Sequence, residues 1–250
     1  MSWQNMVVGL KQMMKKWLPY RLIHMYQQFK KNYKQKTFSN KNIREVFTYI
    51  YKNNYWNNAE SVSGPGSTIE HTKGIIEGIN SFYSHHEICT ILDIPCGDFN
   101  WMQHLNLSNI KYVGADIVEE MVRKNQQFYG REGILFQTLD ITKDSLPTCD
   151  LIINRDCLVH FSNELIFASL KNMMESKATF LMTTTFPNHQ NNVDINTGNW
   201  RPINLTLPPF NLPQPMYVIE ENTIEHSLQK LNRKILGVWK ISDIKAIIEF

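Results

Sequence analysis

The chain has 250 residues, of which 42% are hydrophobic and 20% charged, so a sizeable core can form and general disorder is excluded. The length suits one large α/β domain with an appendage. The net charge of +3 is uneven, because residues 1–55 carry eleven Lys and Arg against one acid, Glu45, whereas residues 56–250 carry 15 against 22. This basic arm suits an anionic surface, namely membrane lipid, a polyanion or an acidic partner.

The four cysteines, Cys89, Cys96, Cys149 and Cys157, lack the spacing of zinc ligands. Three lie in or beside apolar runs, which favours buried free thiols in a reducing cytosol over disulfides. No stretch has the ~18 apolar residues that span a bilayer. The first residues place their charges after the apolar stretch, unlike a signal peptide. We therefore expect a cytoplasmic protein. The sequence requires no metal, and the histidines and acids near the strand ends leave a divalent ion as an alternative.

Residues 4–36 have apolar side chains at three-to-four spacing with lysines and glutamines between them, which predicts a helix that Pro19 kinks or breaks. Either this helix packs with a solvated basic face, or it lies as an amphipathic helix on an anionic membrane, peripheral at the inner face. A second helix is predicted over 41–53. The loop SVSGPGST, residues 61–68, precedes a helix from about 68 to 84.

Strands and helices then alternate. Apolar runs bounded by turn residues predict strands over 88–94, 111–117, 133–141, 150–156 and 178–186, and helical patterns predict helices over 118–130 and 163–176. This alternation predicts a mainly parallel sheet with helices on both faces. A polar, proline-rich stretch over 187–215 interrupts it, and the tail is a predicted helix-to-strand ending, with a hairpin as one way to close the sheet edge.

The stretch ILDIPCGDFNWM, residues 91–102, combines the first strand with the turn after it. In an open α/β sheet, ligands lie beyond the carboxyl ends of the strands, where the strand order reverses. Gly97 lets backbone approach a ligand closely, and amides of the next turn point outward. Asp93, Asp116 and Asp140 stand at the ends of three successive strands. Together they predict a nucleoside-binding crevice.

The chemistry of these acids favours one nucleoside cofactor over another. Asp116 can accept hydrogen bonds from both hydroxyls of a ribose. Asp140 can accept a hydrogen bond from the adenine amine, while the Ile141 amide donates one to the edge of the adenine ring. A dinucleotide site needs G-x-G-x-x-G to seat a pyrophosphate. This turn has one glycine, and Asp98 would repel a pyrophosphate. A cationic amino group and a sulfonium tolerate acids here, so the sequence favours S-adenosylmethionine (SAM) over NAD.

Residues 154–162, NRDCLVHFS, leave the fourth strand where a substrate would meet a methyl group. Methyl transfer is an in-line displacement that depends on alignment, and an alcohol acceptor also needs a base with a pKa near 7. His160 is the candidate base, with Asp156 to orient it, assist it or replace it. Alternatively, His160 packs beside the adenine or caps a helix. Arg155 is predicted to bind a carboxylate or phosphate, or to pair with an acid of the sheet.

The segment 187–204 is long and polar, which is typical of a functional loop, with a surface insert as the alternative. Its amides and acids suit sugar hydroxyls, its indole can stack on a sugar ring, and Arg201 would hold a diphosphate. Trp101 is either a core aromatic or a lid. The residues predicted to bind the acceptor are Trp101, Asn188, Asp194, Trp200 and Arg201.

The ordered motifs DIPCGD, ADI, LDI and LIINRDCLVHFS resemble the class I SAM-dependent methyltransferases over roughly residues 88–186. The resemblance implies a Rossmann-like fold whose seven-stranded sheet has its last strand antiparallel. It also implies that Asp93 lies near the methionine amino group of SAM and Asp116 on the ribose. The chain departs from the family pattern at Pro95 and Phe99, where small residues are common.

The wider set SGPGS, DIPCGDFNWM, GADI, RDCLVHFS, TTTF and NWRPINL is similar to bacterial O-methyltransferases that modify nucleotide-linked heptoses for capsule, over most of 56–220. It implies that SGPGS is a flap over the cofactor, where a simple turn is the alternative. The cofactor site would then comprise Ser63, Gly66, Ser67, Asp93, Pro95, Cys96, Gly97, Asp116, Ile117, Asp140, Ile141 and Arg155.

The expected protein is therefore an N-terminal extension over 1–55 followed by a methyltransferase domain over 56–250, with 187–215 as its substrate-binding loop. The expected reaction is methyl transfer to a hydroxyl of a nucleotide-activated sugar, such as a GDP-heptose. A lipid-linked acceptor and a catalytically silent SAM-binding scaffold are the alternatives, and a homo-oligomer is compatible with either. A nucleic-acid methyltransferase is disfavoured, because the body is acidic and no N/D-P-P-Y signature is present.

Overall fold

The computed structural model describes Phe38, residues 41–221 and residues 233–246. The chain divides into two compact units, residues 1–40 and 41–250, and the second carries the fold described below. The helix predicted over 4–36 and the helical part of the tail lie outside the described residues. The domain boundary after residue 55 stays a prediction, although helix α3 (Ile43–Lys52), on its N-terminal side, belongs to the second unit.

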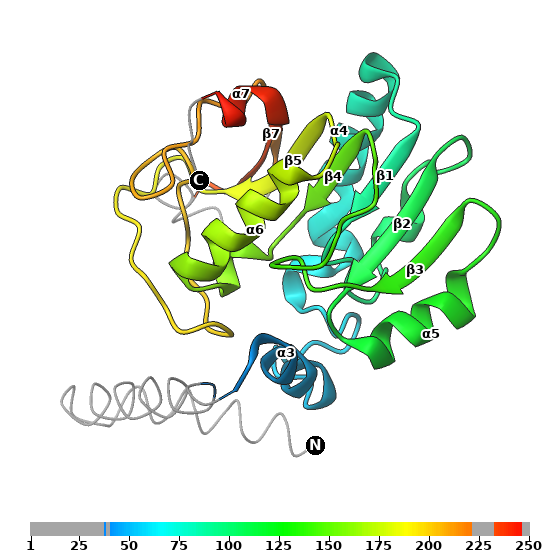
Figure 1. Ribbon diagram of the computed structural model, residues 1–250. Coiled ribbons are helices and arrows are strands. Elements are labelled where there is room, and N and C mark those ends of the chain that lie inside the picture. Colours follow the sequence, from blue (N-terminus) through cyan, green and yellow to red (C-terminus); the bar gives the residue numbers. More distant parts are fainter. Residues whose placement is uncertain (1–37, 39–40, 222–232, 247–250) are drawn as a thin grey trace. The chain divides into compact units, whose positions relative to one another are not determined.

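Within the described residues, seven strands form one sheet in the order β3-β2-β1-β4-β5-β7-β6 (Figure 1). Strands β1 to β5 run parallel, and β7 is antiparallel to both of its neighbours. The five strands predicted from apolar runs are confirmed, and an antiparallel pair closes the edge. The strands are β1 (Thr90–Asp93), β2 (Lys111–Asp116), β3 (Ile134–Thr138), β4 (Leu151–Asn154), β5 (Phe180–Thr185), β6 (Tyr217–Glu220) and β7 (Ile235–Lys240).

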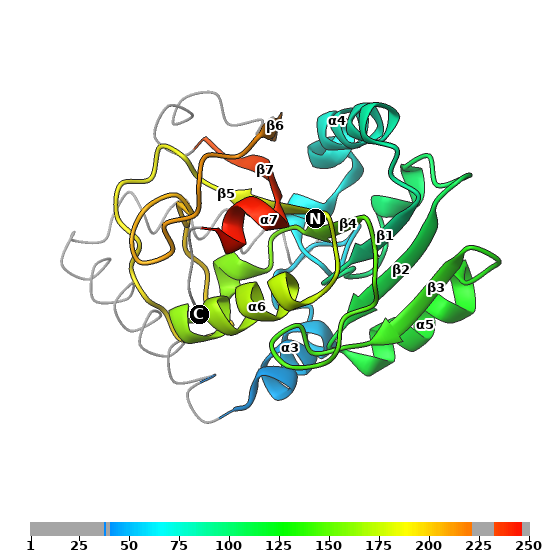
Figure 2. The same ribbon diagram turned by 45° about the horizontal axis from the view of Figure 1, so that its top comes forward.

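Helices cover both faces of the sheet because its central strands are buried on both sides, as parallel strands require. Helices α4 and α5 share one apolar cluster with β1 to β3, and α6 and α7 share the other with β4, β5 and β7. In Figure 2, α6 and α7 lie together on one side of the sheet. The bounds are α4 (Ile69–His86), α5 (Glu119–Tyr129), α6 (Asn163–Glu175) and α7 (Ile241–Lys245).

The connections differ from the predicted elements in two places. Strand β3 ends at Thr138, so Asp140 lies on the turn after the strand. The stretch 187–215 contains no regular element, yet its apolar residues Ile203, Leu205, Phe210 and Leu212 are buried in the core. Within the 187–204 segment, residues 187–197 are exposed or half-buried and Arg201, Ile203 and Asn204 are buried, so the structure packs only the end of that segment into the domain.

Two observations bear on compartment and metal. The four cysteines form no disulfide, and all but Cys89 are buried. In the described part of the chain, no helix is long and apolar enough to cross a membrane, and no group of His, Cys, Asp and Glu has the arrangement of a metal site.

We expect Gly114→Ala to destabilise the sheet. A Cβ at Gly114, on β2, would lie 2.6 Å from Phe136 Cδ1 and 3.0 Å from Tyr112 Cε1. Both rings are fixed against Phe99, with centroids 5.0 and 5.3 Å away. Overpacking of this kind lowers the free energy of unfolding by about 1–3 kcal/mol, which urea denaturation would measure. Leu135→Ala, at a 57% exposed position on β3, should lower it by less than about 1 kcal/mol. Equal losses would contradict the packing argument.

Candidate functional site

A cavity of about 380 Å³ lies beyond the carboxyl ends of β1, β2 and β4, where the strand order reverses. Its walls come from α3, Trp56, residues 62–67, the turns after the first four strands, and three residues that follow β5 in the chain, Phe186, Trp200 and Lys234. All twelve predicted cofactor residues line it, together with His160, Asp156, Trp101 and Trp200. The topology thus brings together segments that are up to 190 residues apart.

Asp93 ends β1 at the floor of the cavity and is 2% exposed. The Tyr112 hydroxyl donates a hydrogen bond of 2.6 Å to Asp93 Oδ2, and no other described residue bonds or ion-pairs with this carboxylate. Burial raises the pKa of Asp93 to about 7, although the Tyr112 hydrogen bond opposes the rise. The cavity therefore contains a buried acid that no cation of the described residues contacts.

Asp116, at the end of β2, is the second buried acid. Its carboxylate accepts hydrogen bonds from the Val118 amide at 3.0 Å and the Gly97 amide at 3.3 Å. Burial raises the pKa of Asp116 to about 6, against the effect of these backbone bonds. Gly97 has φ +55°, and a Cβ there would clash with Ser63 Oγ, so only glycine fits between this turn and the residues above it.

Asp140, the third predicted acid, holds its own turn together. Its Oδ1 accepts bonds from the Thr142 amide at 3.0 Å and the Thr142 hydroxyl at 2.6 Å, and Lys143 Nζ lies 3.5 Å from Oδ2. Asp140 lines the cavity, as does Ile141. A contact with adenine stays a prediction for these two residues.

The segment SGPGS is fastened over the cavity by Asp98. The Ser61 and Ser63 hydroxyls donate to Asp98 Oδ1 at 3.0 and 3.1 Å, and the Val62 amide donates to Oδ2 at 2.8 Å. The Asp98 amide donates in return to Ser63 Oγ at 3.0 Å. This position over the cavity favours the flap interpretation of residues 61–67 over a simple turn. It also gives Asp98 a function that the sequence analysis missed.

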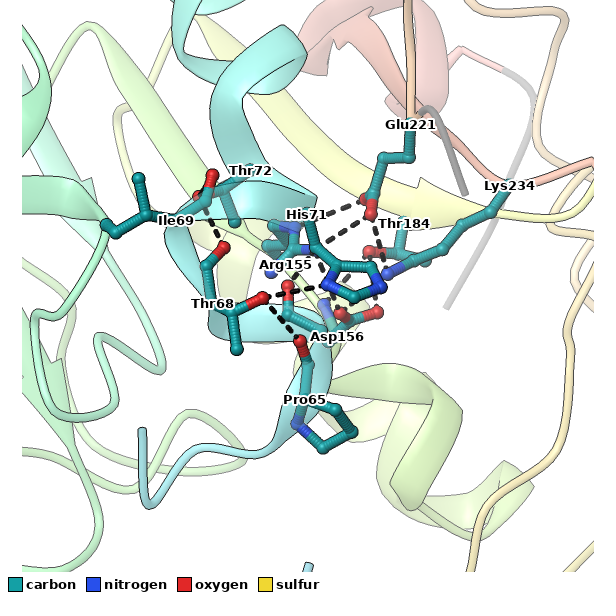
Figure 3. A network of polar contacts seen from close by, with 11 residues as sticks. Pro65, Thr68, Ile69, His71, Thr72, Arg155, Asp156, Thr184, Glu221 and Lys234 are labelled. Carbon is teal, nitrogen blue, oxygen red and sulfur yellow. Dashed lines mark hydrogen bonds and ion pairs between the residues drawn. The ribbon is translucent and has the colours of Figure 1, made fainter. Parts of the chain in front are cut away.

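Arg155 pairs with an acid, which is one of the two roles predicted for it. Its guanidinium binds the Glu221 carboxylate through two bonds of 2.8 and 3.2 Å (Figure 3). It donates to the Gly66 carbonyl at 2.8 Å. It also lies 5.4 Å above the Trp101 ring. Arg155 therefore joins the end of β4 to the flap and to the residue after β6. Its side chain is 4% exposed, with little surface left for a ligand.

Asp156 is held by two cations in the same cluster. Lys234 Nζ lies 2.6 Å from Asp156 Oδ2 and 2.7 Å from Glu221, and Arg155 Nη2 lies 3.4 Å from Asp156. Burial alone would raise the pKa of Asp156, but these cations outweigh it and hold the pKa below its usual value. Asp156 is consequently a weak proton acceptor at neutral pH. The geometry does not support it as the base.

His160 has the geometry of a general base. It ends the turn after β4, and its Nδ1 lies 2.9 Å from the Asn199 carbonyl oxygen. A carbonyl only accepts, so Nδ1 carries the proton and Nε2 has a free lone pair. Burial lowers the pKa of His160, which keeps the imidazole neutral at pH 7. The Trp56 ring packs on the imidazole at 5.1 Å.

Only two of the five residues predicted to bind the acceptor line the cavity. Trp101 is buried beneath Arg155, whereas Trp200 is 55% exposed at the rim, edge-on to Phe186 with centroids 6.0 Å apart. Asn188 is exposed and lies outside the lining.

Asp194 and Arg201 fasten the 187–204 loop. Asp194 Oδ1 accepts from the Asn163 amide at 2.8 Å, at the start of α6. The buried Arg201 guanidinium donates to the carbonyls of Val193 at 3.0 Å and Leu158 at 3.1 Å, and to Asn163 Oδ1 at 3.1 Å. These three bonds use three of the five N–H donors of the buried guanidinium, and a contact with a diphosphate stays a prediction. Neither residue lines the cavity.

Helix α3 forms a wall of the cavity that the sequence analysis did not assign. Its residues Ile43, Phe47, Ile50 and Tyr51 face the cavity. Arg44 donates a 2.8 Å bond to the Ile117 carbonyl, which ties the helix to the turn after β2. Helical periodicity predicted the helix, but periodicity does not say which surface the helix covers.

Neither a family model nor a curated protein matches the sequence. Among solved structures, the chain is similar to a SAM-dependent methyltransferase of Leishmania major, with 15% identity and a TM-score of 0.57, over 82% of this chain and 89% of that one. It is also similar to magnesium protoporphyrin IX methyltransferase from Synechocystis PCC 6803 with bound SAM, with 15% identity and a TM-score of 0.53, over 80% and 98%. This likeness shows the fold: the predicted Rossmann-like class I methyltransferase fold is confirmed.

We expect Asp98→Asn to loosen the flap. The amide that replaces one carboxylate oxygen cannot accept the hydrogen bonds that the flap donates, so opening of residues 61–67 becomes more frequent. Hydrogen–deuterium exchange should show about tenfold faster exchange at the Val62 and Ser63 amides, with α6 unchanged. Unchanged flap exchange would show that Asp98 does not hold the segment.

We expect the stability of the unliganded protein to depend on Asp93 through its raised pKa. The native state binds this proton more tightly than the unfolded state, so the contribution is full below about pH 4 and is lost as pH rises through about 7. From pH 5 to pH 8 the wild type should lose about 2–3 kcal/mol relative to Asp93→Asn. Urea denaturation at each pH measures this difference, and a difference that does not change with pH would contradict it.

Proposed function

We propose that this chain is a SAM-dependent O-methyltransferase that transfers a methyl group to a hydroxyl of a nucleotide-activated sugar, as required for surface polysaccharide or capsule. The observation that carries the proposal is a neutral His160, whose Nε2 bonds to no described residue, in the lining of a cavity that also contains two buried carboxylates, Asp93 and Asp116. A proton acceptor and a site for a cationic adenosyl cofactor thus share one cavity.

The residues fit SAM by their chemistry. Asp93, which no cation of the described residues contacts, suits the cofactor's ammonium group, and Asp116 suits the ribose hydroxyls. Ile117, Met121 and Phe47, which all line the cavity, offer apolar surface to the adenine. The clash that a Cβ at Gly97 would cause shows how closely backbone is packed here. SAM supplies an electrophilic methyl group on a sulfonium.

His160 accepts the proton of the acceptor hydroxyl. Nε2 would take that proton while bound SAM would supply the methyl group, so the products would be a methyl ether and S-adenosylhomocysteine. The Asn199 carbonyl fixes the tautomer that this step needs. Asp156, which interacts electrostatically with His160, stabilises the imidazolium that results. Asp156 is therefore assigned an assisting role, through its charge.

The acceptor portion of the cavity is aromatic. Trp56, Trp101, Phe186 and Trp200 line it beside His160, and aromatic faces suit the C–H faces of a sugar ring. We propose that the sugar ring lies among these residues. Basic residues 1–55 are proposed to hold the enzyme peripherally at an anionic surface on the cytoplasmic side, on the ground of their charge.

The proposal is tested by incubating the protein with SAM and a panel of GDP-, UDP- and dTDP-sugars, followed by mass spectrometry. A product heavier by one methylene unit, and dependent on both substrates, is the expected result. SAM binding without turnover on any sugar nucleotide would instead favour the silent scaffold. Methylation of lipid-linked sugars but of no sugar nucleotide would show that the acceptor is a lipid-linked sugar.

We expect His160→Gln to lower kcat by about 10²–10⁴-fold, because glutamine cannot take a proton at neutral pH. The Kd for SAM should stay within about threefold, since the predicted cofactor contacts lie elsewhere in the cavity. Steady-state assays and calorimetry measure the two quantities. His189→Gln, on the adjacent loop and outside the cavity lining, is the matched control and should retain activity. Full activity of His160→Gln would exclude this residue as the base.

A further inference from the structure

The surroundings of Asp93 are unusual for a buried carboxylate. Its one described hydrogen-bond donor is a neutral phenol, Tyr112, at 2.6 Å, and this bond occupies Oδ2 only. The nearby guanidinium of Arg155 donates its hydrogen bonds to the Glu221 carboxylate and to the Gly66 carbonyl. An isolated buried carboxylate without a paired cation is disfavoured in its charged form, so it tends to take up a proton.

The other titratable groups that face Asp93 do not change this picture. Asp116 on β2 adds a like charge, and Cys96 on the turn and Tyr83 on α4 are neutral thiol and phenol groups whose pKa values burial raises. The Tyr83 hydroxyl is buried and has no hydrogen-bond partner in the described part of the chain. Arg155 lowers the pKa of Asp93 but is the last of the contributors in size.

We propose that the cofactor's ammonium group and a proton compete for Asp93, so that SAM binding expels a proton from this carboxyl, and that Tyr112 is the positioning residue that sets the pH of the exchange. This inference rests on the proposed function and deepens it. The proton leaves Asp93 for solvent, and no other bond changes.

Tyr112 is built to hold one carboxylate oxygen and leave the other free. Its ring is 1% exposed and packs against Phe99 and Phe136, with centroids 5.3 and 6.0 Å away. Burial raises the pKa of Tyr112, so its hydroxyl stays protonated and remains a donor. Because Oδ2 receives that bond, Oδ1 is the oxygen that remains for the ammonium.

The pH dependence follows by linkage. Below the pKa of Asp93, about 7, the unliganded protein carries the proton and must release it to bind the cation. Affinity therefore falls up to tenfold per pH unit below 7 and levels off above it. The Tyr112 hydrogen bond favours the charged carboxylate, so its loss raises the pKa of Asp93. The pH above which the affinity stays constant is then higher.

The experiment is isothermal titration calorimetry from pH 6 to pH 8 in two buffers of different ionisation enthalpy, which counts the protons released. The probes are S-adenosylhomocysteine, which carries the ammonium group, and 5′-methylthioadenosine, which lacks it. For the wild type we expect about tenfold weaker binding of S-adenosylhomocysteine at pH 6 than at pH 8, with nearly one proton released at pH 6. Methylthioadenosine should release markedly fewer, because it leaves Asp93 protonated.

The variants separate a positioning role from a structural one. Tyr112→Phe should move the pH midpoint for S-adenosylhomocysteine upward and leave methylthioadenosine unaffected. Tyr83→Phe, the matched control, removes a hydroxyl near Asp93 that bonds to nothing described and should leave the midpoint in place. Asp93→Asn should bind S-adenosylhomocysteine weakly, without the Asp93-linked proton release.

Two results would overturn the inference. One is binding of S-adenosylhomocysteine with no excess proton release over methylthioadenosine between pH 6 and pH 8. The other is a Tyr112→Phe variant whose affinity falls equally at every pH, which marks a structural residue. Absence of binding for SAM and for both probes at any pH would contradict the proposed function itself. Failure of the proposed function is therefore distinguishable from failure of this inference.

Discussion

Two buried carboxylates line one cavity, and no cation of the described residues forms an ion pair with either of them. Asp93 and Asp116 end adjacent parallel strands, and the parallel register aligns Asp93 with Gly114, two residues before Asp116. Both acids are desolvated, and both have raised pKa values. Buried carboxylates without a paired cation lower the free energy of unfolding, and binding of a cationic ligand raises it. The site and its ligand class follow from this constraint.

The charged side chains next to the end of β4 are paired with one another, unlike Asp93 and Asp116. Arg155, Asp156, Glu221 and Lys234 form a compact cluster of two cations and two anions, with contacts from 2.6 to 3.4 Å. This cluster neutralises itself and holds the flap carbonyl of Gly66, so it acts as scaffold. Burial lowers the pKa of His160 and leaves it neutral beside this cluster, whereas the two cations of the cluster hold the pKa of Asp156 low.

The sequence predicted the fold, and it predicted a set of residues that the structure brings together around one cavity, because these signals are local. Apolar runs mark buried strands, and acids at strand ends must meet at one edge of a parallel sheet. The acceptor side was harder: Arg201 and Asp194 are polar loop residues, and such residues serve the backbone of their own loop as readily as a ligand. Glu221 and Lys234 were missed because no spacing rule connects them to β4, although the sheet brings them there. The contribution of Trp56 and α3 to the cavity was missed as well, because no sequence motif marks these residues.

The most direct test of the central claim is a crystal structure of the protein with S-adenosylhomocysteine at pH 8. The account predicts the ligand's ammonium nitrogen within hydrogen-bonding distance of Asp93 Oδ1, its ribose hydroxyls on Asp116, and its sulfur facing the side of the cavity that carries His160. A ligand bound elsewhere, or bound here with its ammonium directed away from Asp93, would contradict it.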